Sequence, residues 1–144
     1  MAIDSPRPLH QQPSALVAVF VGGVVGTSAR YVLERTFPAS TGQWPWATFG
    51  INLSGAALLG MISALLVAQS SESVRRRQLR LFAGTGCCGA FTTYSTFALE
   101  QTNLWRADAP GTAIAYAVVS VGGGVLMALA GFGVGDWLSG KRTR

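Results

Sequence analysis

The sequence predicts an all-α membrane protein whose chain crosses the bilayer four times. Two observations carry this prediction. Hydrophobic residues make up 49% of the 144 residues and charged residues only 12%, which is about half the charged share of a soluble domain. The charged residues also lie between long uncharged stretches that match the roughly 20 residues of a transmembrane helix. This composition excludes an ordinary water-soluble enzyme.

The four spans are expected at about residues 14–35, 46–68, 79–105 and 111–138. The first apolar run is the shortest, so its helix is extended to about Arg35. The second span begins near Trp46, because two prolines and a glycine mark a loop before it and because Trp44 and Trp46 suit the headgroup interface. Residues 1–13 form a polar leader that we expect to be disordered, residues 14–139 form one membrane domain, and residues 140–144 form a basic tail.

The basic residues indicate the orientation of the chain in the cell membrane. Four spans place both termini and the loop between the second and third spans on one side. That side holds Arg7, Arg75, Arg76, Arg77, Arg80, Lys141, Arg142 and Arg144. The other side holds only Arg35 and Arg106. The positive-inside rule therefore predicts cytoplasmic termini for this multi-pass protein.

The third span has an unusual composition for a membrane helix. Residues 84–97 combine glycines and hydroxyl side chains with Tyr94, and such a sequence supports a continuous helix poorly. We therefore expect this helix to be broken at its centre, where freed backbone groups can line a cavity. The alternative is a packing surface whose hydroxyls bond their own helix. Phe91, Tyr94 and Phe97 recur every three residues; on a helix their ring edges can face an anion, although core packing is the commoner role of such a stripe.

Polar residues in the other spans extend this picture. Asn52 is the sole amide in the middle of the second span, four residues after Thr48, and an intramembrane amide needs a partner or serves a pathway. Tyr116 and Ser120 lie one helical step apart in the fourth span. Arg30 either extends its charge to the interface or has an electrostatic role inside the protein.

Small residues favour close packing between the spans and an oligomer. Three small-xxx-small pairs occur, namely Gly22 with Gly26, Gly50 with Ser54, and Gly131 with Gly135. Such pairs let membrane helices approach closely. Because four thin helices enclose little space, a pathway for a solute requires at least a dimer.

The remaining chemistry excludes several functions. The sole histidine, His10, lies in the polar leader, and the adjacent Cys87 and Cys88 cannot form the disulfide framework of a secreted protein. The acidic residues Glu34, Glu100, Asp108 and Asp136 lie near span ends and show no spacing typical of paired acid–base catalysis or metal ligation, so we expect no enzyme. Nucleic-acid binding is not expected either, because topology already explains the arginines.

Three segments together resemble the CrcB/Fluc family of fluoride channels. They are residues 22–31 (GGVVGTSARY), 45–55 (PWATFGINLSG) and 89–97 (GAFTTYSTF) followed by Glu100. The similarity covers about residues 15–138. The third segment is the most specific of the three in a chain of this length and hydropathy, whereas the glycine pairs alone would be a weak signal.

The resemblance implies a dimer of four-helix subunits, arranged antiparallel in the membrane, with two narrow pores that conduct fluoride passively and reject chloride. Such export lowers fluoride toxicity, because hydrogen fluoride enters cells as a neutral molecule and dissociates in the cytoplasm. It also implies a structural sodium ion (Na⁺) at the dimer centre. By position, the backbone carbonyls of Gly89 and Thr92 from both subunits would hold it, as suits a hard cation.

The resemblance also assigns the fluoride pathway. Phe97 matches one pore phenylalanine and Tyr94 stands where the other is usually phenylalanine. Asn52 matches the pore asparagine, and Tyr116 and Ser120 match a polar track whose third member here would be Gly124, which has no hydroxyl. A strongly hydrated anion needs donors in place of water, and the hydroxyls of Thr93, Ser95 and Ser120 are candidates alongside the amide.

The charge bias leaves the partner open. A chain that inserts in both orientations should show little bias, so a homodimer with dual topology and a heterodimer with a related chain of opposite orientation remain comparable expectations. The alternative function is that of a small multidrug exporter, another dimer of four-helix chains. Such exporters need an acidic residue within the first span, where this chain has none before Glu34. A structural subunit that transports nothing is the third possibility.

Overall fold

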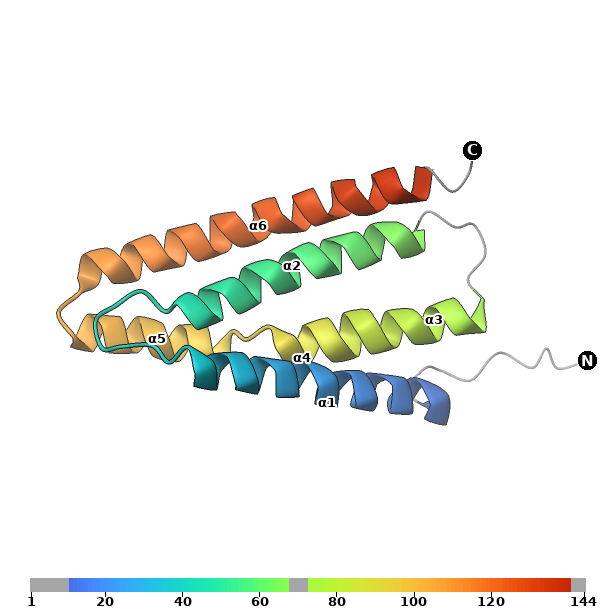
Figure 1. The fold of residues 1–144 in the computed structure, drawn as a ribbon, viewed down its shortest axis with the longest axis horizontal. Coiled ribbons are helices and arrows are strands. Elements are labelled where there is room, and N and C mark those ends of the chain that lie inside the picture. The colour runs from blue at the N-terminus through green and yellow to red at the C-terminus, as the bar shows by residue number, and fades with distance from the viewer. Residues whose placement is uncertain (1–10, 68–72, 141–144) are drawn as a thin grey trace, which may run out of the picture.

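The computed structural model describes residues 11–67 and 73–140, and all regular structure within these ranges is helical (Figure 1). Its elements are α1 (Pro13–Thr36), α2 (Trp46–Val67), α3 (Val74–Arg80), the π-helical stretch η2 (Leu81–Cys88), α4 (Gly89–Phe91), α5 (Ser95–Arg106) and α6 (Pro110–Gly140). Residues 1–10 of the predicted leader, residue 68 of the second predicted span and residues 141–144 of the predicted tail lie outside the described residues.

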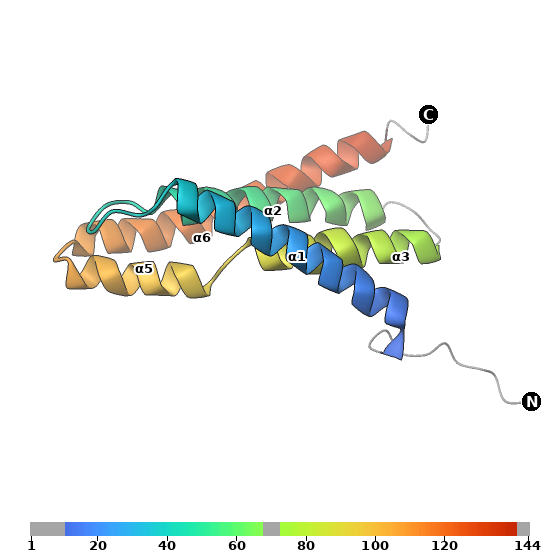
Figure 2. The same cartoon turned by 60° about the horizontal axis from the view of Figure 1, so that its bottom comes forward.

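The helices lie side by side along one long axis (Figure 1). The chain runs along the bundle in α1, returns in α2, runs forward again from α3 to α5 and returns in α6. Helix α2 packs along α6, whereas α1 packs against η2 and α4, and α1 crosses its neighbours obliquely (Figure 2). Consequently residues 37–45 and 107–109 form loops at the same end of the bundle.

Three helices in the described part of the chain are long and apolar enough to cross a membrane: Pro13–Thr36, Trp46–Leu66 and Pro110–Gly140. They coincide with the first, second and fourth predicted spans. The predicted span at 79–105 is not among them, because that segment is divided into short helical pieces, the longest of which is the 12-residue α5.

The outer surface of the bundle is apolar. Phe20, Val118 and Leu126 are 72%, 66% and 67% exposed, whereas a soluble monomer rarely exposes large contiguous apolar patches. The fully buried cluster is small and contains Leu104 and Tyr116. Together with the three apolar helices, this surface identifies a membrane protein.

Two of the three predicted glycine pairs bring helices together. A Cβ atom on Gly26 would overlap the carbonyl oxygen of Cys87 in η2, and one on Gly131 would overlap the carbonyl oxygen of Ala57 in α2. The third pair, Gly50 with Ser54, does not pack against another helix of the described chain. A Cβ on Gly50 would meet nothing within 4 Å, and the exposed Ser54 hydroxyl donates to the Gly50 carbonyl of its own helix.

Candidate functional site

The segment from α3 to α5 loses its helical winding at Thr92, Thr93 and Tyr94. Helix α4 ends at Phe91, and Thr92 is extended with φ −73° and ψ 157°. The preceding η2 stretch is also unusual, because π-helical turns are rare and occur frequently at functional sites. The three aromatic residues therefore do not share one helix face, since Phe91 precedes the interruption and Phe97 follows it.

Asn52 of α2 satisfies the backbone at this interruption. Its Oδ1 accepts a hydrogen bond from the Thr93 backbone N–H at 2.8 Å, and its Nδ2 donates to the Thr93 carbonyl at 3.0 Å. Both groups would otherwise be unpaired inside an apolar bundle, which costs about 1–3 kcal/mol for each. The amide thus stabilises the non-helical backbone.

The same contacts free two carbonyl groups. In a continuous helix, the N–H groups of Thr93 and Thr96 would bond the carbonyls of Gly89 and Thr92. Here the Thr93 N–H donates to Asn52 and the Thr96 N–H donates to the Thr93 hydroxyl at 3.1 Å. The predicted sodium ligands are therefore two carbonyls without their helical partners.

A groove of about 430 Å³ lies beside the interruption, between α2, the α3–α5 segment and α6. It brings together most of the predicted site residues, which are Asn52, Gly89, Thr92, Thr93, Tyr94, Phe97 and Ser120. Ser95, Tyr116 and Arg30 do not line it. The predicted amide, both predicted rings and the hydroxyl residues Thr93 and Ser120 therefore converge at this groove.

Ser120 and Asn52 offer hydrogen-bond donors to this groove. The Ser120 hydroxyl oxygen is buried and has no hydrogen-bond partner among the described residues. The amide of Asn52 has two N–H groups, and its hydrogen bond to the Thr93 carbonyl uses one of them. Thr93 lines the groove too, but its hydroxyl already interacts with those of Ser95 and Thr96 at 3.2 and 3.0 Å.

One helical turn along α5 from Phe97, a second polar cluster closes the groove. The Tyr116 ring is fully buried, its centroid lies 5.1 Å from that of Phe97, and its hydroxyl donates to Glu100 Oε2 at 2.8 Å. Thr48 donates to Glu100 Oε1 at 2.6 Å. The Tyr116 hydroxyl, predicted as part of a polar track, is therefore engaged by a carboxylate.

Thr48 and Glu100 have no role among the residues predicted from the sequence. Two signals pointed to them: Thr48 precedes Asn52 by four residues, so both lie on one face of α2, and Glu100 completes the family-like motif. Their direct contact joins residues 52 positions apart, which no spacing along the chain reveals.

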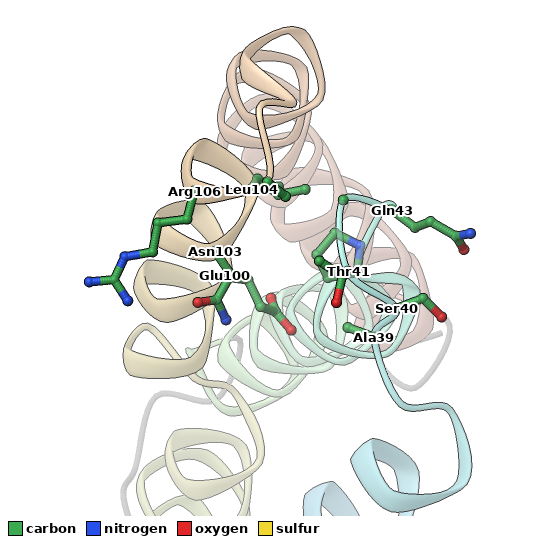
Figure 3. A pocket seen from close by; sticks show the side chains of 11 residues that line it. Ala39, Ser40, Thr41, Gln43, Glu100, Asn103, Leu104 and Arg106 are labelled. Carbon is green, nitrogen blue, oxygen red and sulfur yellow. The ribbon is translucent and has the colours of Figure 1, made fainter.

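A second cavity, of about 360 Å³, opens beyond Glu100 at the end of the bundle (Figure 3). Figure 3 shows Glu100, Asn103 and Arg106 on α5 and, across from them, side chains of the loop at residues 39–43. Glu100 lines this cavity and Phe97 lines the groove. The layer of Phe97, Tyr116 and Glu100 therefore separates the two hollows.

Arg30, Tyr94 and Ser95 lie outside this enclosed layer. The Arg30 Nε donates to the Ala90 carbonyl of α4 at 3.2 Å, and its Nη1 lies 3.9 Å from Glu34 Oε1. The guanidinium thus points toward the interrupted segment. Tyr94 is 82% exposed although its ring centroid lies 6.1 Å from that of Phe97, and Ser95 is exposed as well.

The two tryptophans predicted to suit the headgroup interface lie in different surroundings. Trp46 is 70% exposed, but the Trp44 ring packs edge-on against Tyr116 at 5.3 Å between centroids. Trp44 therefore covers the buried tyrosine, because the loop folds back over the end of α6.

Comparison with known proteins gives consistent matches. A model of the family described as CrcB-like protein, Camphor Resistance (CrcB), matches residues 17–132. The chain is 38% identical to "Fluoride-specific ion channel FluC 2" of Leifsonia xyli subsp. xyli, with 99% of this chain and 97% of that protein covered. It is 38% identical to the protein of the same name from Nocardia farcinica, with 92% of each covered. It is 36% identical to "Fluoride-specific ion channel FluC 1" of Cutibacterium acnes, with 94% of each covered.

Proposed function

The chain belongs to the CrcB family, and we propose that it is a fluoride-specific channel whose pathway follows the groove beside the helix interruption. The observation that carries this pathway is the convergence in the groove of the buried, unpartnered Ser120 hydroxyl and the Asn52 amide. Fluoride is small and strongly hydrated, so the protein must replace its water with aimed donors. The edges of the Tyr94 and Phe97 rings add the positive side of their quadrupoles. Passive export by this route lowers the toxicity of fluoride.

The segment from α3 to α5 serves as the third of four crossings in this proposal. Non-helical backbone at membrane depth requires that its polar groups be satisfied by protein or line a cavity. The contacts of Thr93 with Asn52 and of Ala90 with Arg30 meet the first condition, and the groove meets the second. With four crossings, the arginine bias predicts cytoplasmic termini.

A partner subunit completes the groove in this proposal. Tyr94 lines the groove yet is 82% exposed, so a second, antiparallel subunit is needed to enclose the ring and the pathway beside it. The relatives carry the names FluC 1 and FluC 2, which supports a pair of related chains as well as a pair of identical ones.

The residues at the interruption fit a structural Na⁺ ion. The carbonyls of Gly89 and Thr92 have lost their helical N–H partners and lie beside the groove. No group of three or more His, Cys, Asp or Glu side chains suited to a metal occurs in the described ranges, and sodium, a hard cation, accepts carbonyl oxygens. When bound, the ion would neutralise these oxygens and join the interrupted segments of two subunits.

Vesicle efflux tests the proposal. Purified chain reconstituted into liposomes should release fluoride and little chloride, measured with ion-selective electrodes. Two preparations should be compared, the chain alone and the chain with a related second chain. Release by the chain alone indicates a homodimer, and release only by the mixture indicates a heterodimer. Equal release of both anions, or none in either preparation, refutes a fluoride-specific channel.

The exporter alternative makes a different prediction. It requires proton-coupled transport of cationic dyes, and in the described part of the chain the first helix holds no acidic residue before Glu34. Expression of the chain should therefore improve growth of a fluoride-sensitive strain under fluoride and leave its sensitivity to cationic dyes unchanged.

A further inference from the structure

Glu34 contacts the interrupted segment from α1, although the proposed pathway does not use it. Its Oε1 accepts a hydrogen bond from the Thr96 hydroxyl at 3.4 Å and lies 3.9 Å from Arg30 Nη1. Arg30, one helical turn away, bonds the Ala90 carbonyl before the interruption. These two charged side chains of α1 therefore contact opposite sides of the break.

A carboxylate at the end of a hydroxyl chain determines the direction of every bond in it. An ionised carboxylate only accepts, and each hydroxyl has one hydrogen to donate. Thr96 uses its hydrogen on Glu34, so Thr93 must donate to Thr96 at 3.0 Å. With the Thr93 hydrogen used, Ser95 must be the donor in its 3.2 Å contact with Thr93. The series of donated hydrogen bonds therefore runs from Ser95 through Thr93 and Thr96 to Glu34.

This direction removes donors from the predicted pathway. The Thr93 oxygen donates once and accepts from the Ser95 hydroxyl and the Thr96 N–H, so its bonding capacity is filled. Ser95 is exposed, but its one hydrogen points inward and its outer face presents lone pairs only. Both hydroxyls expected to donate to fluoride are thus turned away from it.

We infer that Glu34 is a positioning residue that sets the direction of these hydroxyl hydrogen bonds and keeps fluoride binding weak at Ser95, which adjoins the groove through its contact with the groove-lining Thr93. The inference rests on the proposed function. An ion must bind a channel well enough to enter and weakly enough to leave. If the direction of these hydrogen bonds were reversed, the Ser95 hydroxyl would donate outward and bind the anion more tightly.

The variant Glu34→Gln tests the inference, because its side-chain N–H can donate to Thr96 and so permit the reversed direction. In vesicle flux measured against fluoride concentration, the half-saturating concentration should fall about tenfold, as expected for one added hydrogen bond to an anion.

The variant Thr96→Val should also let the Ser95 hydroxyl donate outward, by a different change. It removes the hydroxyl that links Thr93 to Glu34. The Thr93 hydroxyl is then free to donate to Ser95, whose own hydrogen turns outward. The half-saturating concentration should again fall, and adding Glu34→Gln to this variant should change nothing further. Ser95→Ala should abolish the gain from Glu34→Gln.

Two results would overturn the role of Glu34. One is a Glu34→Gln channel with reduced maximal flux and an unchanged half-saturating concentration, which indicates a merely structural contact. The other is a Glu34→Gln effect of equal size with and without Thr96. Fluoride release by the wild-type chain in the same vesicles separately supports the proposed function, whatever the variants show.

Discussion

Replacement of Asn52 by aspartate should nearly abolish fluoride conduction. The two side chains have the same shape, and aspartate keeps the acceptor for the Thr93 N–H. It removes the N–H that donates to the Thr93 carbonyl and the second N–H that the proposed pathway uses. It also places a negative charge at the groove. An anion about 5 Å away would be repelled by about 3 kcal/mol at an effective dielectric constant near 20, or on the order of a hundredfold in occupancy.

Fluoride efflux from vesicles measures this effect. The matched control is Asn103→Asp, which makes the same chemical change at an exposed amide in the outer cavity. There water screens the new charge, so flux should fall by no more than about threefold. Assembly of both variants is checked by size-exclusion chromatography. Asn52→Asp channels that assemble and conduct within threefold of wild type would show that the anion does not pass this amide.

Three further changes test other parts of the structure. Ser120→Ala should lower fluoride flux about tenfold because it removes a buried, unpartnered donor. The control is Ser139→Ala, which should leave flux unchanged because the Ser139 hydroxyl bonds its own helix. Equal effects of the two variants would contradict the role of Ser120. Gly131→Val should destabilise the α2–α6 contact by about 1–3 kcal/mol or prevent assembly, seen as a lower melting temperature, and Gly50→Val should be tolerated because nothing lies near its Cβ. Exchange of sodium for an organic cation during purification should lower the melting temperature of the dimer, by the linkage between a bound ion and stability, and an unchanged temperature would remove the ion from the proposal.

Hydropathy was sufficient to predict three of the spans, because a membrane imposes length and polarity on a single helix. Composition indicated where the third segment changes its winding, since glycines and hydroxyl residues favour alternatives to a helix. The exact place of the interruption depends on Asn52, which bonds Thr93 41 residues away in the chain. A sequence presents both residues but not their contact, so the position of the break required the structure.

The residue types alone did not show in which direction the hydrogen bonds of the site run. A hydroxyl in a pore sequence is counted as a donor, yet the Tyr116 hydrogen is used by Glu100 and the Thr93 hydrogen by a chain that ends on Glu34. Tertiary neighbours decide whether a hydroxyl is free. Among the candidates, Ser120 alone combines burial in the described bundle with an oxygen that has no partner.

Two carboxylates beside the proposed anion pathway are compatible with conduction because both oxygens of Glu100 and one oxygen of Glu34 already interact with other groups. Glu100 accepts from Thr48 and Tyr116, and Glu34 accepts from Thr96 and lies close to Arg30. Each hydrogen bond disperses negative charge that would otherwise repel the anion, and each also withdraws a donor that would otherwise bind it. In the proposed pathway the carboxylates would therefore lower both the energy barrier to entry and the strength of anion binding, which is the balance that rapid passage of a strongly hydrated ion requires.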